Sequence, residues 1–174
     1  MVQGVLLRTL MMGGIDGIIT IFNIISIVEG SKLNYKYIFI LGFATLFADA
    51  ISMGTGEYYS VKAEKDYNKL NEDEQDERDE RYEINPVKNG VVMFISFIVF
   101  GLIPLVIYYI AVKINYKNKY LNTYISVIIS LFILGVVKSK YTKEKWYISG
   151  GGVAIYGGIA SFLAYNVSKF ISSL

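Results

Sequence analysis

The stretch GVVMFISFIVFGLIPLVIYYIAV, residues 90–112, contains no charged side chain and determines the class of fold. A helix needs roughly 20 mainly apolar residues to cross the hydrocarbon core of a bilayer, and this stretch supplies them without interruption. An open sheet cannot satisfy its backbone in lipid, and the stretch lacks the alternation of a barrel strand. Residues 90–112 are therefore predicted to form a transmembrane helix.

The rest of the chain repeats this pattern. Hydrophobic residues make up 53% of the 174 residues, and ten of the fifteen Asp and Glu residues lie between Glu64 and Glu83. The first span carries Asp16 and no cleavage site, so we expect a retained helix rather than a signal peptide. The sequence predicts an all-α membrane protein with five transmembrane helices, at residues 6–28, 37–60, 90–112, 120–137 and 146–168.

Loop charges predict the orientation of these helices, because cytosolic loops carry the excess of Lys and Arg. If the N-terminus is cytosolic, eleven basic residues face the cytosol and six face the lumen. We therefore expect a cytosolic N-terminus and a lumenal C-terminus. Three regions result: 1–60 with the first two helices and an ion path, 61–89 as an acidic cytosolic segment, and 90–174 with the last three helices.

The chain has no Cys and no His, which excludes thiol redox chemistry, histidine-ligated haem and His-dependent catalytic triads. A metal ion would have to be bound by oxygen or by methionine sulfur. An intramembrane enzyme would need Ser52 or Ser149 with a Lys base, and no Lys lies inside a predicted span. We expect no enzymatic activity, no cofactor and no nucleic-acid partner.

Two predicted spans carry ionisable side chains, which are costly in lipid and usually face a bundle interior or a water-filled path. Each set recurs at helical spacing and therefore lies on one face. In the first span the face comprises Met12, Asp16, Thr20 and Asn23, and in the second it comprises Thr45, Asp49, Met53 and Glu57.

Carboxylate and thioether together indicate a transported divalent ion. Carboxylates are hard ligands, whereas a thioether favours a borderline ion such as Fe2+ or Mn2+ over magnesium or calcium. We predict a metal site at Asp16, Met53, Asp49 and Glu57, with Thr20, Asn23 and Thr45 lining the path.

Each of these residues also has a plainer interpretation. Met53 alone is typical of packing, and Asp16 could serve only a structural hydrogen bond. Glu57 could be a solvated carboxylate at the membrane interface. The glycines beside Asp16 and Met53 suit close helix packing or local unwinding along a path.

The acidic segment between the second and third spans could concentrate cations before transport. As a helix it would place four carboxylates on one side, so we predict metal capture by Glu72, Asp76, Glu80 and Glu83. Arg78 and Arg81 also allow a solvated, salt-bridged helix.

Several motifs resemble one known family. GGIDGIITIFNII (residues 13–25) and FADAISMGTGEYYS (47–60) resemble the first two helices of the vacuolar iron transporter family, which includes yeast-type and plant nodulin-like members. NPVKNGVVMFISFIVFGLIPL (85–105) is similar to the third helix, and residues 134–167 are similar to the last two. The similarity covers nearly the whole chain.

This resemblance implies a homodimer in which the ion path lies between the first two helices of each subunit. It assigns Asp16 and Met53 to that path and implies exchange of cytosolic Fe2+, and often Mn2+, for protons. It also implies the membrane of a vacuole or another organelle. Better-characterised members carry a longer cytosolic metal-binding insertion, whereas only 29 residues are available here. Glu64 falls where the first metal-binding Glu of that insertion would begin, so the resemblance adds Glu64 to the expected capture residues.

The shortened segment leaves a second hypothesis open. The chain could be a membrane protein that does not transport, and whose acidic segment binds a partner or senses metal. Deletion of residues 71–83 would abolish its activity in that case, whereas a transporter would only lose part of its uptake.

Overall fold

The computed structural model describes residues 2–71 and 84–174, and these residues form five α-helices. Each is long and apolar enough to cross a membrane, which confirms the predicted number and order of spans. The observed helices extend beyond the predicted spans at most ends. They are α1 (Val2–Gly30), α2 (Lys36–Asn71), α3 (Pro86–Lys113), α4 (Lys119–Thr142) and α5 (Trp146–Ile171).

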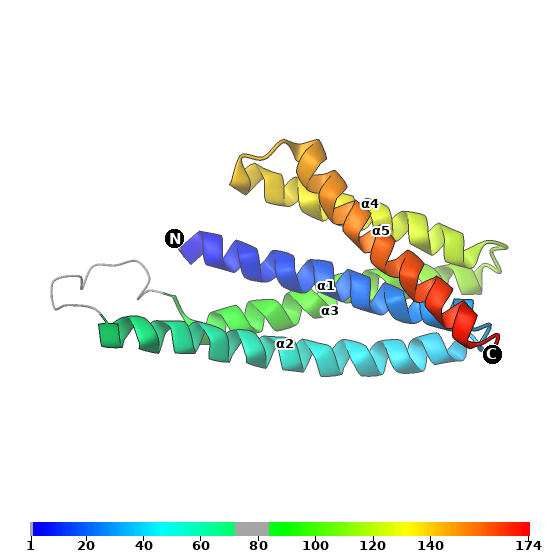
Figure 1. The fold of residues 1–174 in the computed structure, drawn as a ribbon, viewed down its shortest axis with the longest axis horizontal. Coiled ribbons are helices and arrows are strands. Elements are labelled where there is room, and N and C mark those ends of the chain that lie inside the picture. Colours follow the sequence, from blue (N-terminus) through cyan, green and yellow to red (C-terminus); the bar gives the residue numbers. More distant parts are fainter. Residues whose placement is uncertain (1, 72–83) are drawn as a thin grey trace.

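Helix α1 is the centre of the bundle and packs against each of the other helices. Figure 1 shows α1 running between the α2 and α3 pair on one side and the α4 and α5 pair on the other. The N-terminus and the C-terminus lie at opposite ends of the bundle (Figure 1). The chain therefore begins and ends on opposite sides of a membrane that the bundle crosses.

The hydrophobic core of the bundle lies around α1. Ile18, Ile21, Phe22 and Ile25 of α1 are completely buried, together with side chains from α2, α3 and α4. The outer faces of the same helices expose large apolar side chains, such as Ile40 and Ile155 at 62%. Lipid solvates such a surface, so the packing of small and apolar residues between helices holds the bundle together.

The helix ends have local causes. The Asn85 side chain accepts hydrogen bonds from the backbone N–H groups of Val87 and Lys88, at 3.0 and 3.2 Å, and Pro86 occupies the first turn. Lys143 ends α4 in the left-handed conformation. Helix α2 has 36 residues and, at about 1.5 Å per residue, extends past a bilayer of about 30 Å.

Glycines allow α1 and α3 to approach closely beside Asp16. A Cβ atom at Gly13 would lie 2.9 Å from the carbonyl oxygen of Met93, and one at Gly17 would lie 2.5 Å from that of Phe97. The Ser96 hydroxyl donates to the carbonyl oxygen of Leu10 at 2.6 Å across the same contact. Because α1 stays helical throughout, these glycines serve close packing rather than unwinding.

We expect Gly17→Ala to lower the free energy of unfolding by about 1–3 kcal/mol, because backbone atoms of α3 occupy the space for the new methyl group. Thermal unfolding in detergent would measure this loss. Gly151→Ala in α5 is the matched control, because nothing lies within 4 Å of the added Cβ. Equal unfolding temperatures for the two variants would contradict the close contact.

Candidate functional site

The polar face of α1 is only partly covered by the rest of the chain. Met12 is 54% exposed, Asp16 is exposed, and Thr20 and Asn23 are half-buried. The Thr20 hydroxyl donates to Oδ1 of Asp16 at 3.5 Å, which is the one hydrogen bond to this carboxylate among the described residues. The structure therefore presents Asp16 on an accessible face in the middle of a transmembrane helix.

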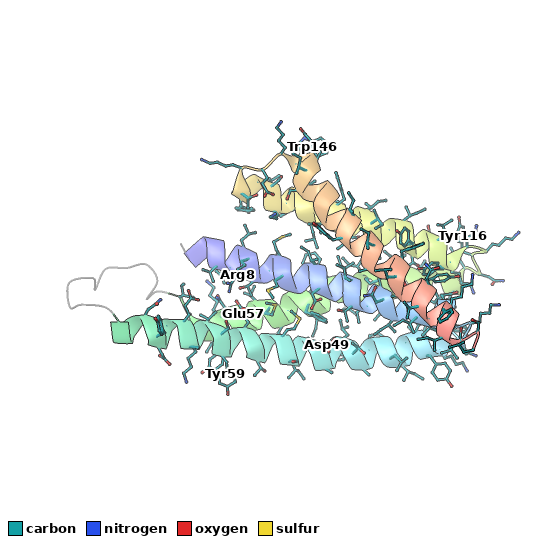
Figure 2. The ribbon with its side chains drawn as sticks, in the orientation of Figure 1. Arg8, Asp49, Glu57, Tyr59, Tyr116 and Trp146 are labelled. Carbon is teal, nitrogen blue, oxygen red and sulfur yellow. The ribbon has the colours of Figure 1, made fainter. Side chains whose placement is uncertain are left out.

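The polar face of α2 lies beside that of α1. Thr45, Asp49 and Met53 are half-buried, and Figure 2 places Asp49 along the middle of α2. The carboxylates of Asp16 and Asp49 are close enough to repel each other electrostatically. Two helices thus bring two carboxyl groups within electrostatic reach of each other, an arrangement that a cation would stabilise.

Met53 is half-buried and packs against the apolar core. This contact agrees with the interpretation of Met53 as a packing residue. Among the residues that the structure describes, no three acidic side chains are grouped closely enough to hold a metal ion. The described residues of this chain therefore offer the carboxylates of Asp16 and Asp49 rather than a complete ligand shell.

Glu57, the last residue of the predicted α2 face, is engaged by α1. Its Oε1 accepts a hydrogen bond from the Thr9 hydroxyl at 2.7 Å and forms an ion pair with Nη2 of Arg8 at 3.2 Å. Glu57 is 8% exposed. Figure 2 shows Arg8 and Glu57 near the same end of the two helices, at the base of the α2 extension. This Glu is neither solvated nor free, and its role as a metal ligand stays a prediction.

Small residues form an exposed stripe along α2 near the polar face. They recur every four residues, and all are accessible in the single chain: Ala44, Ala48, Ser52 and Gly56. Stripes of this kind let a second transmembrane helix approach closely. The exposed side of the carboxylate pair is thus next to a surface suited to helix packing.

The predicted capture residues are only partly described. Glu64 is exposed on the part of α2 that continues beyond the membrane-length segment. It borders a small hollow formed with Lys65, Asn68 and Ile84. Glu72, Asp76, Glu80 and Glu83 lie outside the described residues, and their role in metal capture stays a prediction.

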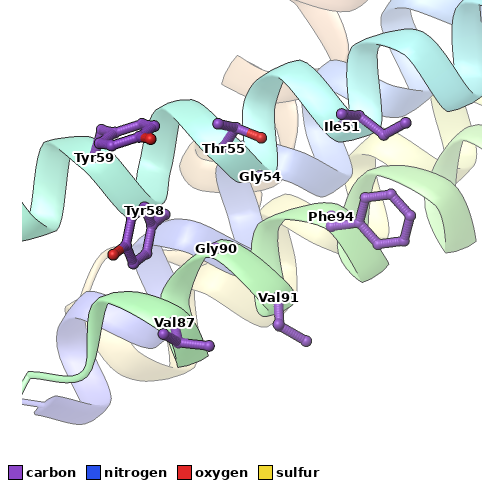
Figure 3. A pocket seen from close by; sticks show the side chains of 9 residues that line it. All are labelled: Ile51, Gly54, Thr55, Tyr58, Tyr59, Val87, Gly90, Val91 and Phe94. Atoms are coloured by element: carbon purple, nitrogen blue, oxygen red, sulfur yellow. The ribbon is translucent and has the colours of Figure 1, made fainter.

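A larger groove lies between α2 and α3 and has a volume of about 510 Å³. Figure 3 shows Tyr58 and Tyr59 at one end of it, and Gly54 facing Gly90 across the two helices. Its remaining lining is apolar apart from Thr55, and no carboxylate of residues 2–71 or 84–174 borders it. The described lining of this groove therefore lacks the charged oxygen ligands that a divalent ion needs.

The structure also shows two polar contacts that the sequence did not reveal. Arg8 and Thr9 reach Glu57 from another helix, and the Tyr108 hydroxyl of α3 donates to Oε1 of Glu29. Glu29 lies one residue beyond the predicted first span, so it was not counted among the ionisable residues of that span. The position of Glu29 directly after the apolar run of the first span is the sequence feature that could have identified it as a carboxylate of the helix bundle.

The sequence is similar to one known family and to several individual proteins. The VIT family matches residues 7–84 and 70–169, which together cover most of the chain. A vacuolar iron transporter of Plasmodium falciparum is 30% identical over 91% of this chain and 80% of its own length. One from Toxoplasma gondii is 30% identical over 94% and 74%. Vacuolar iron transporter homolog 2.1 of Arabidopsis thaliana is 29% identical over 96% and 82%.

Proposed function

The chain belongs to the VIT family, and on this basis we propose that it transports divalent metal, with Fe2+ as the main substrate and Mn2+ as a second. Relatives from three organisms are named as vacuolar iron transporters or homologues of them. With its five apolar helices, the chain is an integral membrane protein of a vacuolar or other organelle membrane. It acts as a transporter rather than an enzyme.

The observation that carries this proposal is the exposed carboxylate of Asp16 beside Asp49. An ionisable side chain inside a transmembrane helix is a functional residue by default, because an apolar residue would avoid the cost of desolvation. Within the described part of the chain, Asp16 accepts one hydrogen bond, from Thr20, and retains acceptor capacity for an ion. In this proposal Asp16 binds the ion, Asp49 adds negative charge, and Met53 adds preference for Fe2+.

A second copy of this chain completes the path in our proposal. One subunit offers two carboxylates on an exposed face, and a homodimer would bring four together. The small-residue stripe of α2 supports this arrangement, because it lets the copies approach without large side chains between them. Covering this face would also remove Asp16 from contact with lipid.

Transport is proposed to exchange cytosolic metal for protons. Protonation of a carboxylate removes the charge that binds the ion, so one group can hold metal and proton in alternation. The loop charges favour a cytosolic N-terminus. The Arg8 and Glu57 end would then face the cytosol, and the α2 extension with Glu64 would raise the cation concentration there.

Uptake by purified protein in liposomes tests the function directly. Vesicles containing a metal-sensitive dye should take up Fe2+ kept reduced in the external buffer, and Mn2+ should compete for uptake. A pH-sensitive dye in the same vesicles should show proton movement against the metal. Absence of Fe2+ and Mn2+ uptake would disprove transport, whereas uptake at constant internal pH would disprove only the exchange.

Met53→Leu should reduce the preference for Fe2+ over Mg2+ and Ca2+ severalfold, because Leu keeps the volume but lacks the thioether. Competition between these ions in the uptake assay measures the ratio. Met11→Leu is the matched control, since Met11 is a buried core residue. Unchanged selectivity in Met53→Leu would leave Met53 with a packing role alone.

A further inference from the structure

Glu29 is a half-buried carboxylate at the end of α1 that the proposed metal path does not use. It lies in the last turn of α1, is half-buried, and accepts a hydrogen bond from the Tyr108 hydroxyl of α3. Tyr108 itself is 1% exposed. The last turn of α1 lies toward the end of the bundle where the C-terminus is found (Figure 1), whereas Arg8 and Glu57 lie toward the other end (Figure 2).

The groups around Glu29 leave its charge without a counter-ion. Tyr120 of α4 is close enough to interact electrostatically with Glu29, and its ring stacks on Tyr165 of α5 at 5.0 Å. From α2, the apolar Phe39 contacts the ring of Tyr108. No ion pair to Glu29 occurs within residues 2–71 and 84–174, although six lysines flank this end: Lys32, Lys36, Lys113, Lys117, Lys119 and Lys169.

Polar side chains continue along α1 from Glu29 toward Asp16. Ser26, Asn23 and Thr20 follow at intervals of three residues, and Thr20 reaches Asp16. The Tyr120 hydroxyl donates to Oγ of Ser26 at 3.2 Å. Oδ1 of Asn23 is buried without a hydrogen-bond partner among the described residues. A buried acceptor in this state normally binds a water molecule.

We propose that Glu29 is the binding site for the exchanged proton on the lumenal side, with Ser26, Asn23 and Thr20 forming the route between it and the metal site. The inference rests on the proposed metal and proton exchange. In the uptake step an O–H bond of a lumenal hydronium ion breaks, leaving water, and an O–H bond forms at a Glu29 carboxylate oxygen. In the release step that bond breaks and the proton passes to a water molecule on the α1 route. Metal and proton thus reach Asp16 from opposite ends of the same helix.

The decisive variant is Glu29→Gln, tested in the full chain in liposomes with metal and pH dyes. Wild type should move protons as Fe2+ enters, and an acidic interior should accelerate uptake. Glu29→Gln should lose most of both responses, because the amide cannot take up the proton. Fe2+ binding in detergent should remain, since Glu29 lies well over two turns from Asp16 along α1.

Glu144→Gln is the matched control. Glu144 is an exposed carboxylate between α4 and α5, and the hydrogen bond from Lys138, at 3.0 Å, lowers its pKa. The variant should keep the wild-type ratio of protons to metal. A wild-type ratio in Glu29→Gln would overturn the role of Glu29 and leave the transport function intact. Absence of metal uptake by wild type would overturn both.

Tyr108→Phe provides a second variant that preserves the ring and its packing. It removes the hydrogen bond that Tyr108 donates to Oε1 of Glu29. The pH of half-maximal uptake, varied on the lumenal side, should therefore shift from that of wild type. A purely structural contact would lower activity without shifting this pH dependence, so an unshifted pH dependence would also count against the proposal.

Discussion

Replacing Asp16 with Asn is expected to abolish most Fe2+ uptake. Asn has nearly the same shape and can still accept from Thr20, so the helix and its packing on α3 should persist. The substitution removes the negative charge that attracts and holds the ion. Loss of outer-shell partners alone costs about 10 to 100-fold in metal affinity, so loss of a charged ligand should cost at least about tenfold.

Initial rates of Fe2+ uptake in liposomes, at equal amounts of folded protein, measure this effect. Asp66→Asn makes the same chemical change on an exposed position of the α2 extension and should transport within about twofold of wild type. Wild-type rates for Asp16→Asn would mean that the ion does not pass along this face of α1.

The second large effect concerns the exposed stripe on α2. Ala48→Trp places a bulky ring where the proposed partner subunit must approach, so the two copies can no longer pack. We expect the dimer to dissociate in detergent and Fe2+ uptake to fall at least about tenfold, because each monomer keeps only half of the carboxylates. The mass of the purified protein and the uptake rate measure the two consequences.

Ile129→Trp is the matched control for the stripe. Ile129 is 53% exposed on α4, away from the polar faces, and a ring there should meet only lipid. This variant should remain dimeric and active. A dimeric, active Ala48→Trp would show that another surface joins the subunits, or that one chain transports alone.

Much of the fold could be predicted from the sequence, because the bilayer fixes the length of a spanning helix and excludes charge from it. The apolar run at residues 90–112 is enough to identify α3, and Asn85 with Pro86 marks where it begins. The alignment of Asp16 with Thr20 also follows from helical spacing alone. These features depend only on residues close together in the sequence, so the sequence is sufficient to predict them.

Contacts between helices could not be predicted in this way. The helices are apolar on nearly all sides, so periodicity does not tell which face meets protein and which meets lipid. The spacing of Glu57 on α2 is compatible both with an unpaired metal ligand and with an ion pair. The structure shows that Arg8 and Thr9 of α1 bind it. Glu29 likewise accepts a hydrogen bond from Tyr108, which is far away in the sequence.

The sequence by itself determined that this chain crosses a membrane as five helices and that carboxylates of α1 and α2 lie within it. Only the tertiary structure decided which of those carboxylates is accessible: Asp16 on an open face, Glu57 in an ion pair, and Glu29 against Tyr108. The physical reason is that helix formation depends on local hydrogen bonds, whereas the state of a buried charge depends on side chains from other helices.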